Sequence, residues 1–156
     1  MLQFGLIIGL VSIIIDQATK LIAVSYLWKP PSVINVFSFL DLTPVENRGI
    51  SFGLFQDSGD IGRWVIAIFA LFIVIFLAVW LRKQQFKFPA FCLGLVIGGA
   101  LGNVIDRLRQ GWVIDFIDFH IGNWHWPAFN FADTFITCGV ILLLIDNLLR
   151  TQKRHK

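Results

Sequence analysis

The chain has 156 residues, of which 56% are hydrophobic and 15% charged, and its mean hydropathy is +0.74. Soluble domains carry about 25% charged residues, so a water-soluble globular domain is excluded, and 16 Phe and 6 Trp exclude a disordered chain. We therefore expect one membrane domain, residues 1–156, with four spans of about 20 residues each.

Four apolar segments follow in chain order, and each is long enough to cross a membrane. They cover about residues 2–27, 64–81, 88–105 and 133–149. The first segment has no basic leader region and no small-residue cleavage site, and Asp16 interrupts its apolar core. We therefore expect a retained helix rather than a cleavable signal peptide.

Basic residues predict the orientation of these spans. Arg82, Lys83 and Lys87 lie between the second and third segments, and a further basic group follows the fourth. Because basic loops stay in the cytoplasm, both termini are expected there, and the loops at about 28–63 and 106–132 are expected outside. Topology thus explains the net charge of +3, and nucleic acid is not expected as a partner.

The outer loops are predicted to carry structure. Residues 33–42 alternate roughly between apolar and polar, which is typical of short strands. The second loop is expected to lie at the membrane surface, with Phe116, Trp124 and Trp126 as interfacial anchors. Both cysteines lie inside apolar runs and are expected to be small buried hydrophobic residues; they are Cys92 and Cys138.

Polar and ionisable residues inside or beside membrane spans are costly and usually functional. Their positions along the predicted spans place the polar and ionisable residues of this chain near the outer ends of the spans. They are Asp16 and Lys20 in the first segment, Asn103, Asp106 and Arg107 at the end of the third, Asp133 at the start of the fourth, and Asp115 and Asp118 in the intervening loop.

Two aspartates in one low-dielectric site are a candidate for peptide hydrolysis without a metal. Such a pair cannot easily ionise twice, so one carboxylate takes a proton from water while the other, protonated, donates to the carbonyl. The chemistry alone leaves four candidates: Asp106, Asp115, Asp118 and Asp133. Asp106 has the alternative of a structural ion pair with the adjacent Arg107.

Two alternatives come from other functional classes. His120 and His125, with nearby acids, suggest a metal-dependent hydrolase, but their spacing does not place both rings on one helical face, and no metal site is expected. A small transporter using Asp16 and Lys20 as a relay is disfavoured because the charges gather at one side instead of along a path.

Five short motifs occur in a fixed order along nearly the whole chain. They are DQATK at 16–20, ENRG at 46–49 followed by Ser51 and Phe52, GGALGN at 98–103 followed by Asp106 and Arg107, VIDF at 113–116, and FNFAD at 129–133. Together they closely resemble the bacterial lipoprotein signal peptidase family, also called signal peptidase II. The chain departs slightly from the pattern at Ile50 and at Ser51, where family members often have Ala.

The resemblance implies a membrane aspartyl protease that removes the signal peptide of prolipoproteins, cleaving before a diacylglyceryl-modified cysteine. It implies an all-α membrane protein of four transmembrane helices, with a small extracytoplasmic β-sheet and an interfacial outer loop. By motif, the catalytic dyad falls on Asp115 and Asp133. No cofactor is implied. The expected partners are diacylglyceryl-modified prolipoproteins and membrane lipids, the expected state is a monomer, and the expected location is the bacterial inner membrane.

The resemblance also implies residues that bind substrate or support the site. They are Asp16, Lys20, Asn47, Gly49, Asn103, Asp106, Arg107, Asn130 and Ala132. Gly94, Gly98 and Gly102 are four residues apart, and this spacing independently predicts close packing of the third span against another helix.

Overall fold

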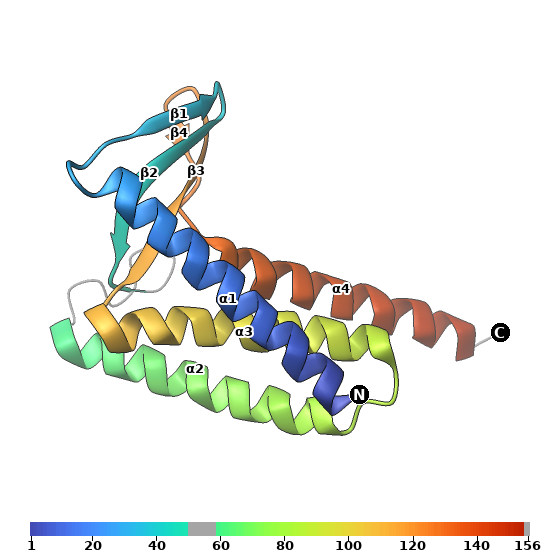
Figure 1. Ribbon diagram of the computed structural model, residues 1–156. Helices are drawn as coiled ribbons and strands as arrows, with labels where there is room; N and C mark the ends of the chain where they lie inside the picture. Colours follow the sequence, from blue (N-terminus) through green and yellow to red (C-terminus); the bar gives the residue numbers. More distant parts are fainter. Residues whose placement is uncertain (50–58, 155–156) are drawn as a thin grey trace.

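The computed structural model describes residues 1–49 and 59–154, so the departures at Ile50 and Ser51 lie outside the described residues. Four long helices form a bundle, and a four-stranded antiparallel sheet stands at one end of it (Figure 1). The helices are α1 (Leu2–Leu27), α2 (Gly59–Arg82), α3 (Lys87–Gln110) and α4 (Phe131–Arg154). The strands, in sheet order, are β1 (Ile34–Phe37), β2 (Leu40–Asn47), β3 (Val113–Ile121) and β4 (Trp124–His125).

All four helices are long and apolar enough to cross a membrane, which confirms the predicted fold of four membrane helices. The helix of the third predicted span extends beyond residue 105, because α3 continues to Gln110. Asp106 and Arg107 are therefore helical, and α3 ends at Gly111 in the left-handed conformation with φ of 88°. Hydropathy underestimates this helix because the protein itself buries these two charged side chains.

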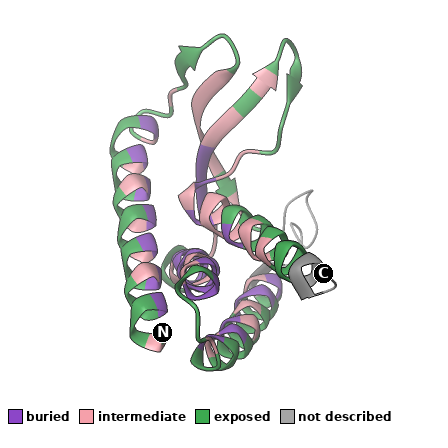
Figure 2. Ribbon diagram, turned by 90° about the vertical axis from the view of Figure 1, so that its right-hand side faces the viewer, coloured by how far each residue is buried: buried purple, intermediate pink, exposed green. Residues whose placement is uncertain are grey.

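The centre of the bundle is α3, with 67% of its apolar window buried, against at most 28% for the other spans. The other three helices all pack on it. In Figure 2 the buried positions of α1 form a stripe along one side of the helix. They are Gly5, Gly9, Ser12, Asp16, Lys20, Ala23 and Leu27. The remaining apolar side chains of α1 face outward, as expected for a helix whose other side contacts lipid.

The close contact predicted from the glycines of α3 is confirmed, and its partner is α1. A Cβ added to Gly98 would collide with the carbonyl oxygen of Gly9 and would lie 2.7 Å from Cβ of Ser12. A Cβ on Gly94 would meet α1 in the same way, 2.9 Å from Cβ of Ile8. The two backbones are therefore in direct contact, and this contact fixes α1 against α3 below the sheet.

The predicted strands within 33–42 are confirmed as β1 and the start of β2. The loop predicted at 106–132 also carries β3 and β4, which the sequence reading did not identify. The segment VIDFIDFHI is rich in β-branched and aromatic residues, which favour strands, but the same aromatic residues are also typical of membrane anchors. Trp124 and Trp126 are indeed exposed, whereas the prediction for Phe116 is wrong because it is buried with Leu27 and Ile114.

The prediction that both cysteines are buried is correct for Cys92 and wrong for Cys138, which is exposed on α4. An apolar run in a membrane helix does not require burial in protein, because lipid covers the outward face. Both chain ends lie at the end of the bundle opposite the sheet (Figure 1).

Candidate active site

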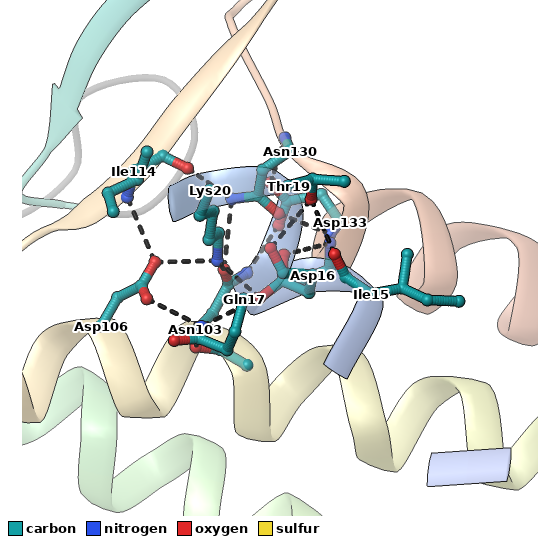
Figure 3. Close-up of polar contacts among 12 residues, drawn as sticks. Ile15, Asp16, Gln17, Thr19, Lys20, Asn103, Asp106, Ile114, Asn130 and Asp133 are labelled. Atoms are coloured by element: carbon teal, nitrogen blue, oxygen red, sulfur yellow. Dashed lines mark hydrogen bonds and ion pairs between the residues drawn. The ribbon is translucent and has the colours of Figure 1, made fainter. Parts of the chain in front are cut away.

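A cluster of buried polar side chains joins the bundle to the sheet (Figure 3). It contains Asp16, Lys20, Asn103, Asp106, Arg107, Asp115 and Asn130, each at most 9% exposed. These residues come from α1, α3, β3 and the start of α4, so the predicted convergence of distant segments is confirmed.

Lys20 is the hub of this cluster. Its Nζ lies 2.9 Å from Oδ2 of Asp16 and 2.8 Å from Oδ2 of Asp106, and it donates to Oδ1 of Asn103 at 2.9 Å. A buried ammonium requires all three of its donors to be satisfied, and these three oxygens satisfy them. Asp106 thus pairs with Lys20, and its suggested ion pair with the adjacent Arg107 is not formed.

Asp16, Lys20 and Asp106, which we call the Lys20 brace, also hold the backbone on both sides of the site. Oδ1 of Asp16 accepts the N–H of Ala132 at 2.9 Å, and Oδ2 of Asp106 accepts the N–H of Ile114 at 3.2 Å. Ala132 directly precedes Asp133, and Ile114 directly precedes Asp115. The brace therefore fixes α4 and β3 relative to each other, immediately beside the two aspartates.

Gln17 completes the brace, although the sequence analysis gave it no role. Its Nε2 donates to Oδ1 of Asp106 at 2.9 Å, to the carbonyl of Gly102 at 3.2 Å and to Oδ2 of Asp16 at 3.2 Å. The available signal was an amide beside a buried carboxylate in a membrane helix, because such a group needs polar partners inside the protein.

Asp133 lies in the first turn of α4 and helps to begin that helix. The N–H of Asp133 donates to Oδ1 of Asn130 at 3.0 Å, and the N–H of Asn130 donates back to Oδ2 of Asp133 at 3.2 Å. This reciprocal pair is a capping box, which satisfies backbone donors that a helix start leaves free. The Asp133 carboxylate has a second donor, Nδ2 of Asn103, which lies 2.8 Å from its Oδ1.

Asp115 is 1% exposed and accepts two amide donors. Nδ2 of Asn47 lies 2.8 Å from its Oδ2, and Nδ2 of Asn130 lies 2.6 Å from its Oδ1. Burial, and next the charge of Asp133, raise the pKa of the Asp115 carboxyl to about 7. Asn130 therefore contacts both aspartates, and the two carboxyl groups influence each other.

Arg107 and Gly49 hold Asn47, one of the two residues that donate hydrogen bonds to Asp115. The Arg107 guanidinium donates through Nη2 to the carbonyl of Gly49 at 3.1 Å and through Nη1 to the carbonyl of Asn103 at 3.4 Å. The N–H of Gly49 in turn donates to Oδ1 of Asn47 at 3.1 Å. This contact orients the Asn47 amide so that its NH₂ group faces Asp115.

A cavity of about 510 Å³ opens beside the cluster. It is lined by Asn47, Trp126, Pro127, Ala128, Phe129, Asp133, Thr134, Ile136, Thr137 and Cys138. The sequence analysis missed the α4 wall, although Thr137 follows Asp133 by four residues and so shares its helical face. A mostly apolar cavity with a few polar groups is typical of a ligand site.

The remaining acidic candidate, Asp118, lies away from the cluster. It contacts Nδ1 of His125 at 2.9 Å, whose ring stacks on that of His120 with centroids 5.0 Å apart. His120 Nε2 lies 3.4 Å from Asp41. Across residues 1–49 and 59–154, no three His, Cys, Asp or Glu side chains are grouped as metal ligands would be.

Comparison with known proteins identifies the family. A family model described as signal peptidase (SPase) II matches residues 8–149. The chain belongs to the signal peptidase II family. This signal peptidase is 42% identical over 151 residues to the lipoprotein signal peptidase of Methylorubrum extorquens (strain PA1), across 92% of this chain and 85% of that protein. It is 45% identical over 144 residues to that of Anaplasma phagocytophilum (strain HZ), across 92% and 91% of the two chains.

Two solved structures share the fold of this signal peptidase. One, described as a bacterial membrane enzyme structure obtained by the in meso method at 2.3 Å resolution, has a TM-score of 0.81 and 32% identity, across 96% of this chain and 90% of that chain. Another, at 1.9 Å resolution, has a TM-score of 0.78 and 33% identity, across 92% of each chain. Members of this family are proteases that remove signal peptides from prolipoproteins, and this signal peptidase is one of them.

Proposed function

We propose that this signal peptidase cleaves diacylglyceryl-modified prolipoproteins immediately before the lipidated cysteine, with Asp115 and Asp133 as its catalytic pair. One observation carries the proposal: two carboxyl groups from distant segments both accept hydrogen bonds from Asn130, Asp115 from its side-chain amide and Asp133 from its backbone N–H, beside a cavity of about 510 Å³. Two carboxyl groups that share one proton are the arrangement that hydrolyses peptides without a metal or a covalent intermediate.

In this mechanism the pair shares one proton and activates a water molecule. The ionised carboxylate takes a proton as the water attacks the scissile carbonyl, and the protonated carboxyl stabilises the developing oxyanion by donating to it. Asn47, Asn103 and Asn130 hold the two carboxyl groups in place, because each donates to at least one of them. No cofactor is required by this chemistry.

We also propose that the protein lies in the bacterial inner membrane with both termini in the cytoplasm and the active site near the outer face. The basic residues Arg82, Lys83 and Lys87 lie at or beside the α2–α3 connection, at the same end of the bundle as both termini (Figure 1). Basic loops favour the cytoplasm. Acyl chains would then anchor the substrate's cleavage site at the depth of Asp133, which positions the peptide bond before chemistry begins.

A single copy of the chain is proposed to be sufficient. All the side chains of the cluster, from α1 to α4, belong to one chain, and Lys20, Asn103, Asn130 and Asp16 find their hydrogen-bond partners within it. We therefore propose a monomer acting as one domain over residues 1–156.

The test is cleavage of a diacylglyceryl-modified prolipoprotein in detergent or liposomes, followed by gel shift with a chelator present. We expect wild type and the matched acidic control Asp118→Asn to cleave. Asp115→Asn and Asp133→Asn should lose about 10³-fold or more in rate, because members of a catalytic unit fail together.

Two results would overturn the proposal. Wild-type cleavage that stops under chelator would favour the metal-dependent alternative with His120 and His125. Full cleavage by either Asp115→Asn or Asp133→Asn would show that the pair does not carry the reaction.

A further inference from the structure

We propose that the two aspartates have fixed and different roles: Asp133 is the general base, Asp115 carries the proton, and Asn103, oriented by Lys20, is the positioning residue that keeps Asp133 ionised. This assignment rests on the proposed function of the pair and adds to it the direction of proton transfer.

The hydrogen-bond partners of Asp133 favour a negative charge on its carboxyl group. Its carboxylate accepts the amide of Asn103 at 2.8 Å and the backbone N–H of Asn130 at 3.2 Å. It also lies in the first turn of α4, where the partial positive charge of the helix start stabilises anions. Asp133 lines the cavity, so a water molecule placed there can reach it. A general base needs both features, a stabilised charge and contact with water.

The side-chain amide of Asn103 cannot rotate away from Asp133 without losing a buried hydrogen bond. Its Oδ1 accepts from the Lys20 ammonium at 2.9 Å and from Nδ2 of Asn130 at 3.2 Å. A flipped amide would direct its NH₂ group at the Lys20 ammonium and would leave one buried donor of that ammonium without an acceptor. The ammonium also polarises the amide, which strengthens the hydrogen bond donated to Asp133. Lys20 therefore acts on Asp133 through Asn103.

The surroundings of Asp115 favour the neutral form by comparison. Asp115 lies on a strand, is 1% exposed and is not among the residues that line the cavity. Its two donors are the amides of Asn47 and Asn130. With Asp133 ionised, the pKa of Asp115 rises to about 7, chiefly through burial and then through the charge of Asp133. Below about pH 7 the buried position of Asp115 thus favours the shared proton on this residue.

Other charged groups surround the pair and remain unchanged in the test below. They are Asp16 and Lys20 of α1, Asp106 and Arg107 of α3, and the surface pair Glu46–Arg48 at the end of β2. The positive charge of Lys20 lowers the pKa of Asp115, but it does not outweigh burial.

The proton transfers follow from this assignment. Water attacks the carbonyl carbon, one of its protons passes to Asp133, and the proton of Asp115 passes to the carbonyl oxygen, which gives a neutral gem-diol. Asp133 then gives its proton to the amide nitrogen as the C–N bond breaks, and one hydroxyl proton of the gem-diol returns to Asp115. The products are the carboxylic acid of the signal peptide and the free amine of the lipidated cysteine, and both aspartates regain their starting states.

The pH dependence of kcat/KM distinguishes the two roles, because each aspartate has its own amide donor. In wild type, activity falls as pH rises through about 7, where Asp115 loses its proton. Asn103→Ala removes a donor from ionised Asp133, so the acidic limb should move up by about one pH unit while the alkaline limb stays. Asn47→Ala removes a donor from Asp115, so the alkaline limb should move up while the acidic limb stays.

The matched control is Asn35→Ala, which removes an amide that donates to the carboxylate of Asp41 at 2.8 Å on the sheet. Its profile should match wild type. Exchanged shifts, with Asn103→Ala moving the alkaline limb and Asn47→Ala the acidic one, would overturn the roles while leaving the catalytic pair in place. Loss of the pair itself is a separate result, full cleavage by Asp115→Asn or Asp133→Asn.

The protonation states can also be measured without catalytic activity, which allows variants that cleave too slowly for the pH profile to be tested. Infrared spectroscopy of the purified protein at pH 5 should show a protonated carboxyl band that is absent in Asp115→Asn and present in Asp133→Asn. A band that persists in Asp115→Asn and disappears in Asp133→Asn would overturn the assignment, and so would a wild-type spectrum without such a band.

Discussion

At the scale of single residues, Asn130 carries the most concentrated set of contacts. Its Nδ2 donates to Asp115 at 2.6 Å and to the carbonyl of Ile114 at 3.2 Å, while its Oδ1 accepts the N–H of Asp133 at 3.0 Å. The two bonds donated by Nδ2 hold β3 and the carboxyl group of Asp115, and the bond accepted by Oδ1 caps the start of α4. One amide thus serves both the stability of α4 and the geometry of the pair, and these tasks are separable by substitution.

Asn130→Ser should separate them. Both variants lose the buried hydrogen bonds of the amide, but serine is as good an N-cap as asparagine, so Asn130→Ala should lose about 1 kcal/mol more unfolding free energy than Asn130→Ser. Neither side chain can donate to Asp115 as the amide does, so both variants should lose at least about tenfold in cleavage rate. Thermal unfolding in detergent and the cleavage assay measure the two effects. Equal activity in Asn130→Ser and wild type would contradict this division.

At the scale of helices and strands, the contact between α1 and α3 determines where Lys20 lies. Glycines bring the two backbones together, and the brace lies further along the same pair of helices. The sequence predicted this contact from a spacing of four residues, because the repeat exposes backbone on one helical face. It did not predict that α3 continues past residue 105, because hydropathy counts Asp106 and Arg107 as water-seeking. Asp106 pairs with Lys20 of α1, and Arg107 donates to Gly49, which follows β2. These partners are too far away in the sequence for a local pattern to predict the contacts.

Graded substitutions in this contact test its role. Gly98→Ala places a methyl group against the backbone of Gly9, so α1 must move away from α3. Gly9→Ala is the matched control, because its nearest neighbour would be the carbonyl oxygen of Gly94 at 3.3 Å. We expect Gly98→Ala to lower the unfolding midpoint by several degrees, an effect of about 1–3 kcal/mol, and to reduce cleavage strongly. Gly9→Ala should do markedly less, and equal effects would contradict the proposed close contact.

At the scale of the whole molecule, the four spans and the sheet form one unit around the polar cluster. The spans were predictable because a bilayer demands long apolar helices, and such runs are visible in any sequence. The choice of Asp115 and Asp133 among four acids was not available from spacing and came from the resemblance. Only the folded chain shows that Asp118 belongs with His125, because the register of β3 and β4 brings them together.

Orientation in the membrane is testable with reporter cysteines in a background carrying Cys92→Ala and Cys138→Ala that still cleaves substrate. Asn123→Cys lies in the exposed turn between β3 and β4, and Gln85→Cys lies in the exposed connection between α2 and α3. A membrane-impermeant maleimide added to spheroplasts should label only the first, and disruption of the membrane should allow labelling of the second. The opposite pattern would place the active site on the cytoplasmic face.

The capping box at the start of α4 has a consequence for the timing of the reaction. The carboxylate of Asp133 that closes the first turn of the helix is, in our assignment, the same group that takes the proton of water. When that charge is neutralised, the turn loses part of its attraction for the carboxylate until the proton is passed on. The first turn of α4, which forms part of the cavity wall, is therefore most stable while the substrate binds and Asp133 is ionised. It is least stable while the peptide bond breaks and Asp133 is protonated. The same proton transfer to Asp133 would therefore advance peptide hydrolysis and weaken the first turn of α4 before the products leave.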